Sequence, residues 1–457
     1  MGPASNALRK KSQTQKERQL SVTYCPIGAL KLAPENPRIH SDKQLKQIAE
    51  SIKVFGFNVP VLVDGESRVI AGHGRVKAAH MLGLADVPTI LLTHLTEAQV
   101  TAFRIADNRL TENATWNEQL LAQQLKILSE ADLDFNVEVT GFEMGEIDVL
   151  IEGAAPETDV SSDPADNLPE IEDAVAVSQP ADLWRLGDHR VLCGNSLSAS
   201  SYSSLLENRR AAMVIADPPY NVPIQGHATG LGRIQHKDFK MASGEMSERE
   251  FTEFLLQCFN HLAENSTDGS LHFIFMDWRH VGELWSAGAR AYSEFKNICV
   301  WVKDNAGMGS LYRSQHELVF VFKKAKSSHR NNVQLGQYGR YRTNVWQYPG
   351  VNSFSRKTEE GNLLELHPTV KPVALVADAI MDCTARREIV LDPFLGSGTT
   401  VIAAERTGRV CYGMELDPIY ADTAVRRWQA FTGQTAVHNS SGRTFREMEE
   451  EKSNAGE

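Results

Sequence analysis

The chain has 457 residues, 42% of them hydrophobic and 23% charged. This length fits about two or three globular domains, and the composition excludes a disordered or fibrous chain. No run of about 18 apolar residues occurs, so we expect no membrane-spanning segment. Six scattered cysteines form no Cys-x-x-Cys pair, which predicts neither a disulfide framework nor a cysteine-rich zinc site and favours a reducing, cytoplasmic compartment.

The net charge of −11 is unevenly distributed along the chain. Residues 1–20 are rich in Lys and Arg and are expected to be a disordered basic tail, and residues 447–457 are expected to be a disordered acidic tail. Residues 153–182 contain eight acidic residues, four prolines, no basic residue and no aromatic residue. This composition predicts an acidic, proline-rich linker, so we expect residues 183–446 to fold and act without the part before them.

Residues 21–152 are predicted to form a small α+β domain with trailing helices. Ser41 is a good N-cap for a helix in which Leu45, Ile48 and Ile52 recur at helical spacing. Short β-branched segments between turns predict strands. The expected strands are residues 59–63, 68–71 and 87–92, and the expected further helices are a segment ending near residue 82 and residues 96–110 and 117–128.

Residues 183–446 alternate predicted strands with predicted helices, a pattern that favours an α/β sheet. The expected strands include residues 211–216, 271–276, 389–391 and 410–414. The last two strands flank a glycine-containing loop and a helix, which is the spacing of a βαβ unit.

The glycine-containing segment reads Asp392-Pro393-Phe394-Leu395-Gly396-Ser397-Gly398-Thr399-Thr400. Its two glycines allow a tight turn and the close approach of a ligand. Glu415 ends the next strand, a spacing that suits a carboxylate on ribose hydroxyls. The segment lacks the Lys of a triphosphate loop and the third glycine of a dinucleotide fingerprint, because position 401 is Val. It therefore favours a nucleoside without phosphates, although a plain tight turn fits this pattern equally well.

A second motif, Asp217-Pro218-Pro219-Tyr220, follows the predicted strand at 211–216. Ligands of open α/β sheets bind at the carboxyl ends of strands. Asp217 and the Pro218 carbonyl are acceptors for an exocyclic –NH₂ group, and Tyr220 is suited to stack on the ring that carries it. The motif therefore indicates a site for an amino-purine or amino-pyrimidine, and the alternative is a rigid loop after a strand.

Asp-Pro-Pro-Tyr precedes the Phe-x-Gly-x-Gly segment in the chain. In that order, the two motifs resemble those of the β class of S-adenosylmethionine-dependent DNA amino-methyltransferases. The resemblance extends over more than two hundred residues and implies a Rossmann-like α/β sheet with circularly permuted motif order. Other segments also resemble the family's motifs, although Asn195 replaces its usual Asp. They are Cys193-Gly194-Asn195-Ser196, Trp301-Val302-Lys303, His316-Glu317, Phe320–Lys323 and His367-Pro368-Thr369-Val370-Lys371-Pro372.

The resemblance implies roles for individual residues. Those of the Asp-Pro-Pro-Tyr motif would hold the target base as the catalytic set: Asp217, Pro218, Pro219 and Tyr220. Others would bind the S-adenosylmethionine cofactor: Asn195, Thr369, Lys371, Asp392, Phe394, Gly396, Gly398, Thr399 and Glu415. Among the latter, Thr369, Lys371 and Asp392 would approach the methionine end. Carbon-5 cytosine methylation is disfavoured, because the Pro-Cys dipeptide typical of its nucleophile is absent.

A basic stretch from Lys303 to Lys357 contains ten Lys or Arg, only two acidic residues and several aromatic residues. This pattern suits contact with DNA phosphates and stacking on bases, and a solvated basic face is the alternative. In the family, target recognition would lie at about residues 324–366. The expected DNA-binding residues are Lys303, Arg313, Arg340, Arg342, Arg356 and Lys357.

Residues 22–112 resemble the ParB/sulfiredoxin-like domain. The segments Asn36-Pro37-Arg38 and Ser51–Gly56 and the turn Gly72-His73-Gly74-Arg75 carry this resemblance. Partition proteins have Gly-Glu-Arg-Arg at that turn, so His73 and Gly74 depart from the family pattern. Glycines before a helix predict a candidate nucleotide or anion site at Gly72–Arg75, and a plain helix start explains them equally well.

We therefore expect a prokaryotic or phage DNA methyltransferase that modifies adenine N6 in double-stranded DNA, with restriction-modification as its context and a homodimer as a candidate assembly. Cytosine-N4 methylation is the nearest alternative, because Asp-Pro-Pro-Tyr accompanies both products. Glutamine and RNA methyltransferases typically have Asn-Pro-Pro-Tyr. An alternative of another class is a ParB-like DNA-binding, partition or nuclease protein whose methyltransferase half is inactive.

Overall fold

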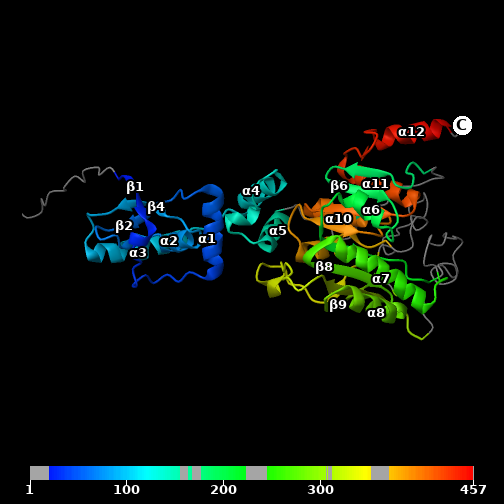
Figure 1. The fold of residues 1–457 in the computed structure, drawn as a ribbon, viewed down its shortest axis with the longest axis horizontal. Helices are drawn as coiled ribbons and strands as arrows, with labels where there is room; N and C mark the ends of the chain where they lie inside the picture. Colours follow the sequence, from blue (N-terminus) through cyan, green and yellow to red (C-terminus); the bar gives the residue numbers. More distant parts are fainter. Residues whose placement is uncertain are drawn as a thin grey trace, which may run out of the picture. The chain divides into compact units, whose positions relative to one another are not determined.

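A computed structural model describes residues 20–154, 163–166, 176–222, 244–304, 306, 311–350 and 370–455 (Figure 1). The chain divides into two compact units. The first contains the residues up to Leu121 and Asp132–Phe142, and the second contains Ala122–Ala131 and the residues from Glu143 onward. Within the described ranges, none of the helices combines the length and the apolar composition that a membrane span requires.

The first unit is built on a four-stranded sheet with the order β1-β4-β2-β3. Ser41 caps α1 as expected, because its hydroxyl accepts the backbone N–H of Gln44. The apolar side chains of Val61, Val69 and Val76 form the centre of the small core. The elements are β1 (Val22–Pro26), α1 (Asp42–Phe55), β2 (Val61–Val63), β3 (Val69–Ala71), α2 (His73–Met81), β4 (Asp86–Leu91) and α3 (Glu97–Glu112), and α4 (Glu118–Glu130) runs from this unit into the second.

The second unit contains a ten-stranded mixed sheet with the order β11-β9-β10-β8-β7-β12-β13-β6-β5-β14. Strands β8, β7, β12, β13 and β6 are parallel to one another, and β10 and β9 extend this block with antiparallel pairing. The strands are β5 (Leu183–Leu186), β6 (His189–Cys193), β7 (Ala211–Ala216), β8 (Ser266–Met276), β9 (Glu294–Val302), β10 (His316–Lys323), β11 (Val345–Gln347), β12 (Ile389–Asp392), β13 (Val410–Glu415) and β14 (Val437–His438).

Helices cover both faces of this sheet, and successive residues of a central strand point to opposite faces. Met213 and Ile215 of β7 join the core beneath α9, α10 and α11, whereas Val214 and Ala216 join the core beneath α6, α7 and α8. Figure 1 shows α7 and α8 running side by side. The helices are α5 (Met144–Gly153), α6 (Ala199–Leu206), α7 (Glu248–Glu264), α8 (Val281–Ala291), α9 (Val373–Cys383), α10 (Thr399–Thr407), α11 (Pro418–Thr432) and α12 (Phe445–Ala455). The expected Rossmann-like α/β class is confirmed.

Residues 163–166 and 176–182 belong to the expected linker, but they are packed against the second unit instead of forming an unpacked chain. The Asp166 carboxylate accepts the backbone N–H of Val373 at 2.8 Å, and Ala165 is buried. The Asp422 carboxylate accepts the backbone N–H groups of Val177 and Ser178 at 2.6 and 3.0 Å. These segments supply backbone and apolar contacts to the methyltransferase-like sheet domain, so composition alone was a poor guide to their structure.

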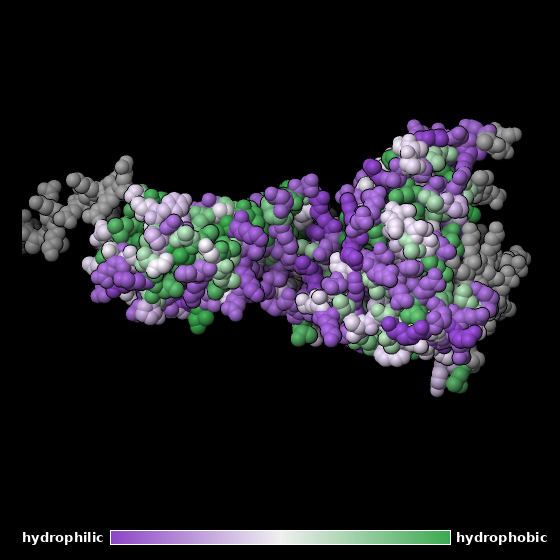
Figure 2. Space-filling view, in the orientation of Figure 1, coloured by the Kyte–Doolittle hydropathy of each residue, from purple (hydrophilic) through white to green (hydrophobic). Residues whose placement is uncertain are grey.

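The C-terminal residues also differ from the expected disordered tail. Residues 445–455 form α12, whose surface is hydrophilic in Figure 2. Phe445 at its start is fully buried against Trp184. Glu449 pairs with Arg426 at 2.7 Å, and the Lys452 ammonium donates to two backbone carbonyls in the former linker. A single buried aromatic residue and a few polar contacts therefore hold an acidic helix that looks unstructured in the sequence.

Helix α5 was expected to belong to the first domain, but it is anchored in the second unit. Asp148 is completely buried and receives two hydrogen bonds from the Arg409 guanidinium, at 2.9 and 2.7 Å, and one from Arg386 at 3.2 Å. A β-carbon at Gly145 would lie 2.5 Å from the carbonyl oxygen of Asn332, so only glycine fits this contact. The boundary predicted at residue 183 therefore cuts through a packed structure.

Candidate active site

Four neighbouring strands end at one edge of the large sheet, and each contributes a polar side chain there. Asp217 follows β7, Asp392 ends β12, Glu415 ends β13, and Asn195 lies two residues after β6. Because these strands are parallel, their carboxyl ends meet at this edge. The structure therefore brings both sequence motifs and the Asn195 segment to one place.

Five side chains at this edge form a buried cluster, called here the Asp217 cluster. The Lys371 ammonium lies 2.6 Å from one oxygen of Asp217 and 3.1 Å from Glu317. The Tyr220 hydroxyl donates to the other oxygen of Asp217 at 2.6 Å and lies 3.2 Å from Glu317. Lys303 pairs with the second oxygen of Glu317 at 2.5 Å. The negative charges of the two acids and the positive charges of the two lysines thus balance each other at the Asp-Pro-Pro-Tyr motif.

Asp217 is the carboxylate of this cluster that remains accessible. Its side chain keeps 24% of its exposure, against 10% for Glu317 and 7% for Lys371. Burial raises the pKa of Asp217, against the opposing effect of Lys371, and the Glu317 charge adds to the rise. A hydrogen-bond donor that enters the site can therefore reach Asp217 more readily than Glu317.

The glycine loop lies beside this cluster and contains two further carboxylates. Each oxygen of Glu415 accepts one backbone N–H, from Gly396 at 2.8 Å and from Asp417 at 2.9 Å. Asp392 accepts the N–H of Phe394 and the hydroxyl of Thr400, and burial raises its pKa to about 7. Each carboxylate oxygen has a second lone pair, so both groups can accept further hydrogen bonds.

These groups fit the chemistry of S-adenosylmethionine. A ribose diol needs a hydrogen-bond acceptor that is itself held in place, and Glu415 is such an acceptor. A cationic methionine end needs an anion nearby, and ionised Asp392 is such an anion. Gly398 has a left-handed backbone (φ +86°), and a β-carbon there would lie 2.7 Å from the side chain of Ala424. Glycine at this position is therefore required by the packing of α11 against the loop.

Other expected cofactor residues take part in the packing of the loop. The Thr399 hydroxyl donates to the backbone carbonyl of Lys371 at 3.4 Å and accepts from Arg427 at 3.0 Å. Phe394 is half-buried against Phe254. The Asn195 side chain accepts the backbone N–H of Leu197 at 2.9 Å.

The expected DNA-binding residues fall into three groups. Arg356 and Lys357 lie outside the described residues, as does Thr369 of the cofactor set. Lys303 is a member of the Asp217 cluster, and its ammonium lies 4.6 Å from the ring centroid of Trp301. Arg313 is exposed in the segment that leads into β10, and its guanidinium donates to the carbonyl of Ala306.

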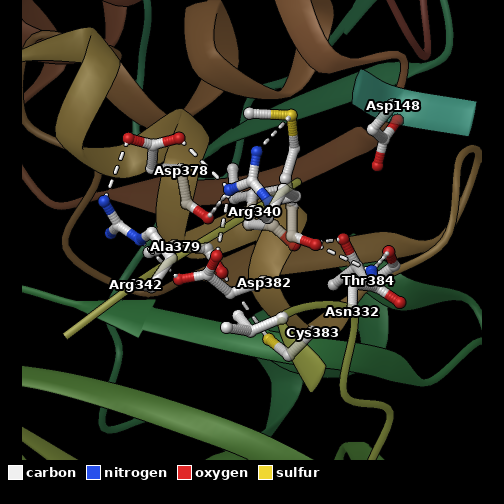
Figure 3. A network of polar contacts seen from close by, with 12 residues as sticks. Asp148, Asn332, Arg340, Arg342, Asp378, Ala379, Asp382, Cys383 and Thr384 are labelled. Atoms are coloured by element: carbon white, nitrogen blue, oxygen red, sulfur yellow. Dashed lines mark hydrogen bonds and ion pairs between the residues drawn. The ribbon is translucent and has the colours of Figure 1, made fainter. Parts of the chain in front are cut away.

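Arg340 and Arg342 do not fit the expected contact with phosphate, because carboxylates hold both guanidinium groups (Figure 3). Arg340 is buried and pairs with Asp382 at 2.9 Å and Asp378 at 3.2 Å. Arg342 contacts the same two acids at 3.1 and 3.2 Å. Asp378 and Asp382 of α9 therefore neutralise the charges of these two arginines, an effect that a local count of basic residues does not reveal.

Together with the contacts of Asp148, these pairs form an arginine network between α5, α9 and the residues that precede β11. Glu152 of α5 reaches Arg340 at 3.7 Å, and Asn332 donates to the carbonyls of Met381 and Thr384. Figure 3 shows how the arginine side chains and Asn332 converge on α9. The segment around Asn332 and Arg340, in the expected target-recognition region, is thus held by polar contacts with both α5 and α9.

Sequence reasoning did not assign Glu317 to the site. Glu317 pairs with Trp301 of β9 in register, and the next residue pairs with Met276 of β8. The start of β10 therefore lies at the edge where the parallel strands end. An acidic residue at the beginning of the apolar strand His316–Lys323 was the available signal.

The first unit contains a pocket of about 440 Å³. It is lined by α1, the turn Gly56–Val59, Arg75 and residues Val139–Gly141. The Arg75 guanidinium donates to the carbonyl of Val59 at 3.0 Å. His73, two residues before Arg75 in the chain, is buried, and burial lowers its pKa to about 4, so it is neutral at physiological pH.

Three family models match the chain in succession. Residues 10–109 match the ParB N-terminal domain, residues 119–180 match the ParB-methyltransferase HTH domain, and residues 211–426 match the DNA methylase model. The second match covers α4, α5 and most of the expected linker.

Individual proteins give the same division. The ParB-like nuclease domain-containing protein YnaK of Escherichia coli is 47% identical over 81 residues, which are 18% of this chain and 93% of that protein. The type II methyltransferase M2.MboI of Moraxella bovis is 27% identical over 247 residues, which are 50% of this chain and 85% of that protein. The solved PvuII DNA methyltransferase (cytosine-N4-specific) aligns with a TM-score of 0.39 at 16% identity, over 62% of this chain and 94% of that one.

The methylase match contains both sequence motifs, and the glycine loop and Asp217 lie side by side in the structure. The chain therefore contains an S-adenosylmethionine-dependent DNA methylase domain of the N6/N4 family, which residues 211–426 match, and it carries a ParB-like domain at its N-terminal end.

Proposed function

We propose that the protein transfers the methyl group of S-adenosylmethionine to the N6 amine of adenine in double-stranded DNA. The observation that carries this proposal is Asp217, an accessible carboxylate fixed by Lys371 and Tyr220 at the end of β7. An acceptor held in this way is preorganised for the two hydrogens of an exocyclic amine. The Pro218 carbonyl, which follows in the chain, is the second acceptor.

The exocyclic nitrogen is a weak nucleophile, because its lone pair is delocalised into the ring. Two acceptors on its hydrogens favour a pyramidal nitrogen and return the lone pair to it. Bound S-adenosylmethionine supplies a methyl group on a positively charged sulfur. The protein contributes position and electrostatics, which supply most of the acceleration in reactions of this kind.

Glu415 and the glycine loop are proposed to hold the adenosine, with Asn195 and Phe394 beside it. Asp392 is proposed to face the methionine end. The charge of Asp217 contributes to the raised pKa of Asp392, so the two carboxylates lie close together, which supports adjacent cofactor and base sites. Arg313, next to the exposed Tyr312, is the described residue best placed to contact a phosphate.

Nucleoside mass spectrometry of DNA from cells that express the protein tests this proposal. We expect N6-methyladenosine in its deoxy form, and none when Asp217→Ala is expressed at the same level. Deoxy-N4-methylcytidine instead would establish the alternative product, since the Asp-Pro-Pro-Tyr motif accompanies both. DNA without either product would favour the alternative in which only the ParB-like domain acts on DNA.

A candidate nucleotide or anion site in the ParB-like domain is supported by the pocket that Arg75 lines. Burial lowers the pKa of Arg75, and an anionic ligand would offset the cost of that buried charge. Calorimetric titration with CTP and with inorganic phosphate tests the site. We expect heat that disappears in Arg75→Ala, and the same heat in that variant would refute the assignment.

A further inference from the structure

The Asp217 cluster contains one buried carboxylate that the proposed reaction leaves without a role. Glu317 contacts Lys303 through one oxygen and Lys371 and Tyr220 through the other. Burying an ionised carboxylate is costly unless it is fully paired, and here two cations and a hydroxyl surround it. Within the cluster, Glu317 is connected to Asp217 only through Lys371 and Tyr220.

The connectivity is that of a closed ring. Asp217 directly follows β7 and Glu317 lies in β10, and each of them contacts both the Lys371 ammonium and the Tyr220 hydroxyl. Strand β8 pairs with β7 on one side and with β10 on the other, so backbone pairing fixes the separation of the two acids. Moving Glu317 would remove one of the two contacts of Lys371 and one of the two contacts of Tyr220 within the ring.

We infer that Glu317 is a positioning residue for methyl transfer, which holds Tyr220 against the target base and keeps Lys371 as the charge partner of Asp217. This inference rests on the proposed function and assigns Lys371 to the base-binding side of the site rather than to the methionine end of the cofactor. The family resemblance implies that Lys371 approaches the methionine end, whereas its contacts with Asp217 and Glu317 support the role inferred here.

The ring also provides a destination for the proton that the reaction releases. The amine nitrogen forms a bond to the methyl carbon, the bond between that carbon and sulfur breaks, and sulfur keeps the electron pair. The methylated amine then carries one proton too many, which passes to the Asp217 carboxylate. Lys371 stays paired with Glu317 when Asp217 becomes neutral, so no buried cation is left without a partner.

The electrostatics of the two acids agree with this division of roles. Burial would raise the pKa of Glu317, but Lys371 and Lys303 hold it down to about 2, so this acid stays ionised. The pKa of Asp217 is raised by burial and by the Glu317 charge, and lowered by Lys371 and Tyr220. Asp392 also lies close enough to interact with Asp217. Asp217 is thus the better proton acceptor of the two.

Glu317→Gln and Lys371→Met test the ring, because they shift the titration of Asp217 in opposite directions. The probe is ¹³C NMR of full-length protein labelled at the aspartate carboxyl carbon, with the Asp217 signal assigned by its loss in Asp217→Asn. Removing the Glu317 charge should lower the titration midpoint of Asp217, and removing the Lys371 charge should raise it. Glu405→Gln, which removes a carboxylate bound to His189 and Trp428 instead, is the matched control.

Single-turnover methylation at saturating DNA gives the second readout. In Glu317→Gln we expect the plateau rate to fall by about 10- to 100-fold, the range for a residue that orients a contacting group without touching the substrate. The acid limb of the rate should move to lower pH together with the NMR midpoint. An unchanged midpoint of Asp217 in both variants, or shifts in the same direction, would overturn the inference. A wild-type chain that titrates as described but methylates no DNA would refute the proposed function and leave the ring intact.

Discussion

Two groups of buried ion pairs lie within the second unit, and they differ in the cation that they use. The Asp217 cluster is built on lysines, whereas the arginine network joins Asp148, Asp378 and Asp382 to guanidinium groups. Lysine is a compact charge whose pKa responds to its surroundings, whereas arginine forms rigid, paired hydrogen bonds and stays charged. Asp217 remains 24% exposed and Asp148 is 0% exposed. Both groups contain buried ion pairs, so such pairs alone do not mark the candidate site. The candidate site differs from the scaffold in its type of cation and in having one carboxylate that stays accessible.

The largest expected effect comes from removing α5. A fragment of residues 183–455 lacks Asp148, the carboxylate partner of Arg409, and also lacks the segments 163–166 and 176–182 that contact the sheet. The broken buried pair alone costs about 3–5 kcal/mol. We expect this fragment to melt about 10 °C below a fragment of residues 143–455, since each kcal/mol shifts the midpoint by about 2–4 °C in a domain of this size. Scanning calorimetry of the two fragments measures the difference.

Residues 143–455 with Asp148→Asn serve as the control for this comparison. The variant keeps the helix but removes the charge that Arg409 faces, so its midpoint should fall towards that of the shorter fragment. Equal midpoints for all three proteins would mean that α5 is a dispensable attachment and that the domain boundary at residue 183 was right.

Fold and site were predictable from the sequence to different degrees. The strand at 211–216 matches β7 in full, because an apolar run bounded by turn residues is a local signal. Asp217 was identified because it follows such a run directly. Glu317 was not, because its role depends on the pairing of β10 with β8 and β9, which no local pattern encodes.

The same limit explains the errors about α5 and Arg340. Asp148 lies 261 residues from Arg409 in the chain. In the sequence, Asp148 therefore cannot be told apart from a surface acid near the expected linker. Arg340 lies in a basic stretch, but the carboxylates that neutralise it, Asp378 and Asp382, come from α9. Charge counted along the chain predicts a partner only when no other segment of the fold supplies the opposite charge.

An intermediate effect is expected from the pH dependence of cofactor binding. With its pKa at about 7, Asp392 is largely protonated at pH 6 and becomes an anion as the pH rises. Because the ionised form attracts a cationic ligand, S-adenosylmethionine should bind roughly eightfold more tightly at pH 7.5 than at pH 6. Calorimetry measures this change, and Asp392→Asn should abolish it. A variant with the same pH dependence as the wild type would show that another group is responsible.

The smallest expected effect concerns two arginines of the basic stretch. Arg342 is held by α9, so Arg342→Lys should leave the salt dependence of DNA binding unchanged. Arg313 is exposed, and Arg313→Ala should reduce the slope of log affinity against log salt by about one unit for one lost phosphate contact. Fluorescence anisotropy at several salt concentrations gives both slopes. The reverse pattern would return Arg342 to the DNA-binding set.

The most direct test compares Asp217→Asn with Asp148→Asn in the full chain, measuring the thermal midpoint and the single-turnover rate of methyl transfer to DNA for each. Asp217→Asn should lower the rate by about 10²–10³ with a nearly unchanged midpoint, since it removes one preorganised group at an accessible position. Asp148→Asn should lower stability by about 3–5 kcal/mol and, measured well below its midpoint, keep a rate close to that of the wild type. If both variants lost the same property, whether rate or stability, the distinction between a catalytic charge cluster and a structural arginine network would be contradicted.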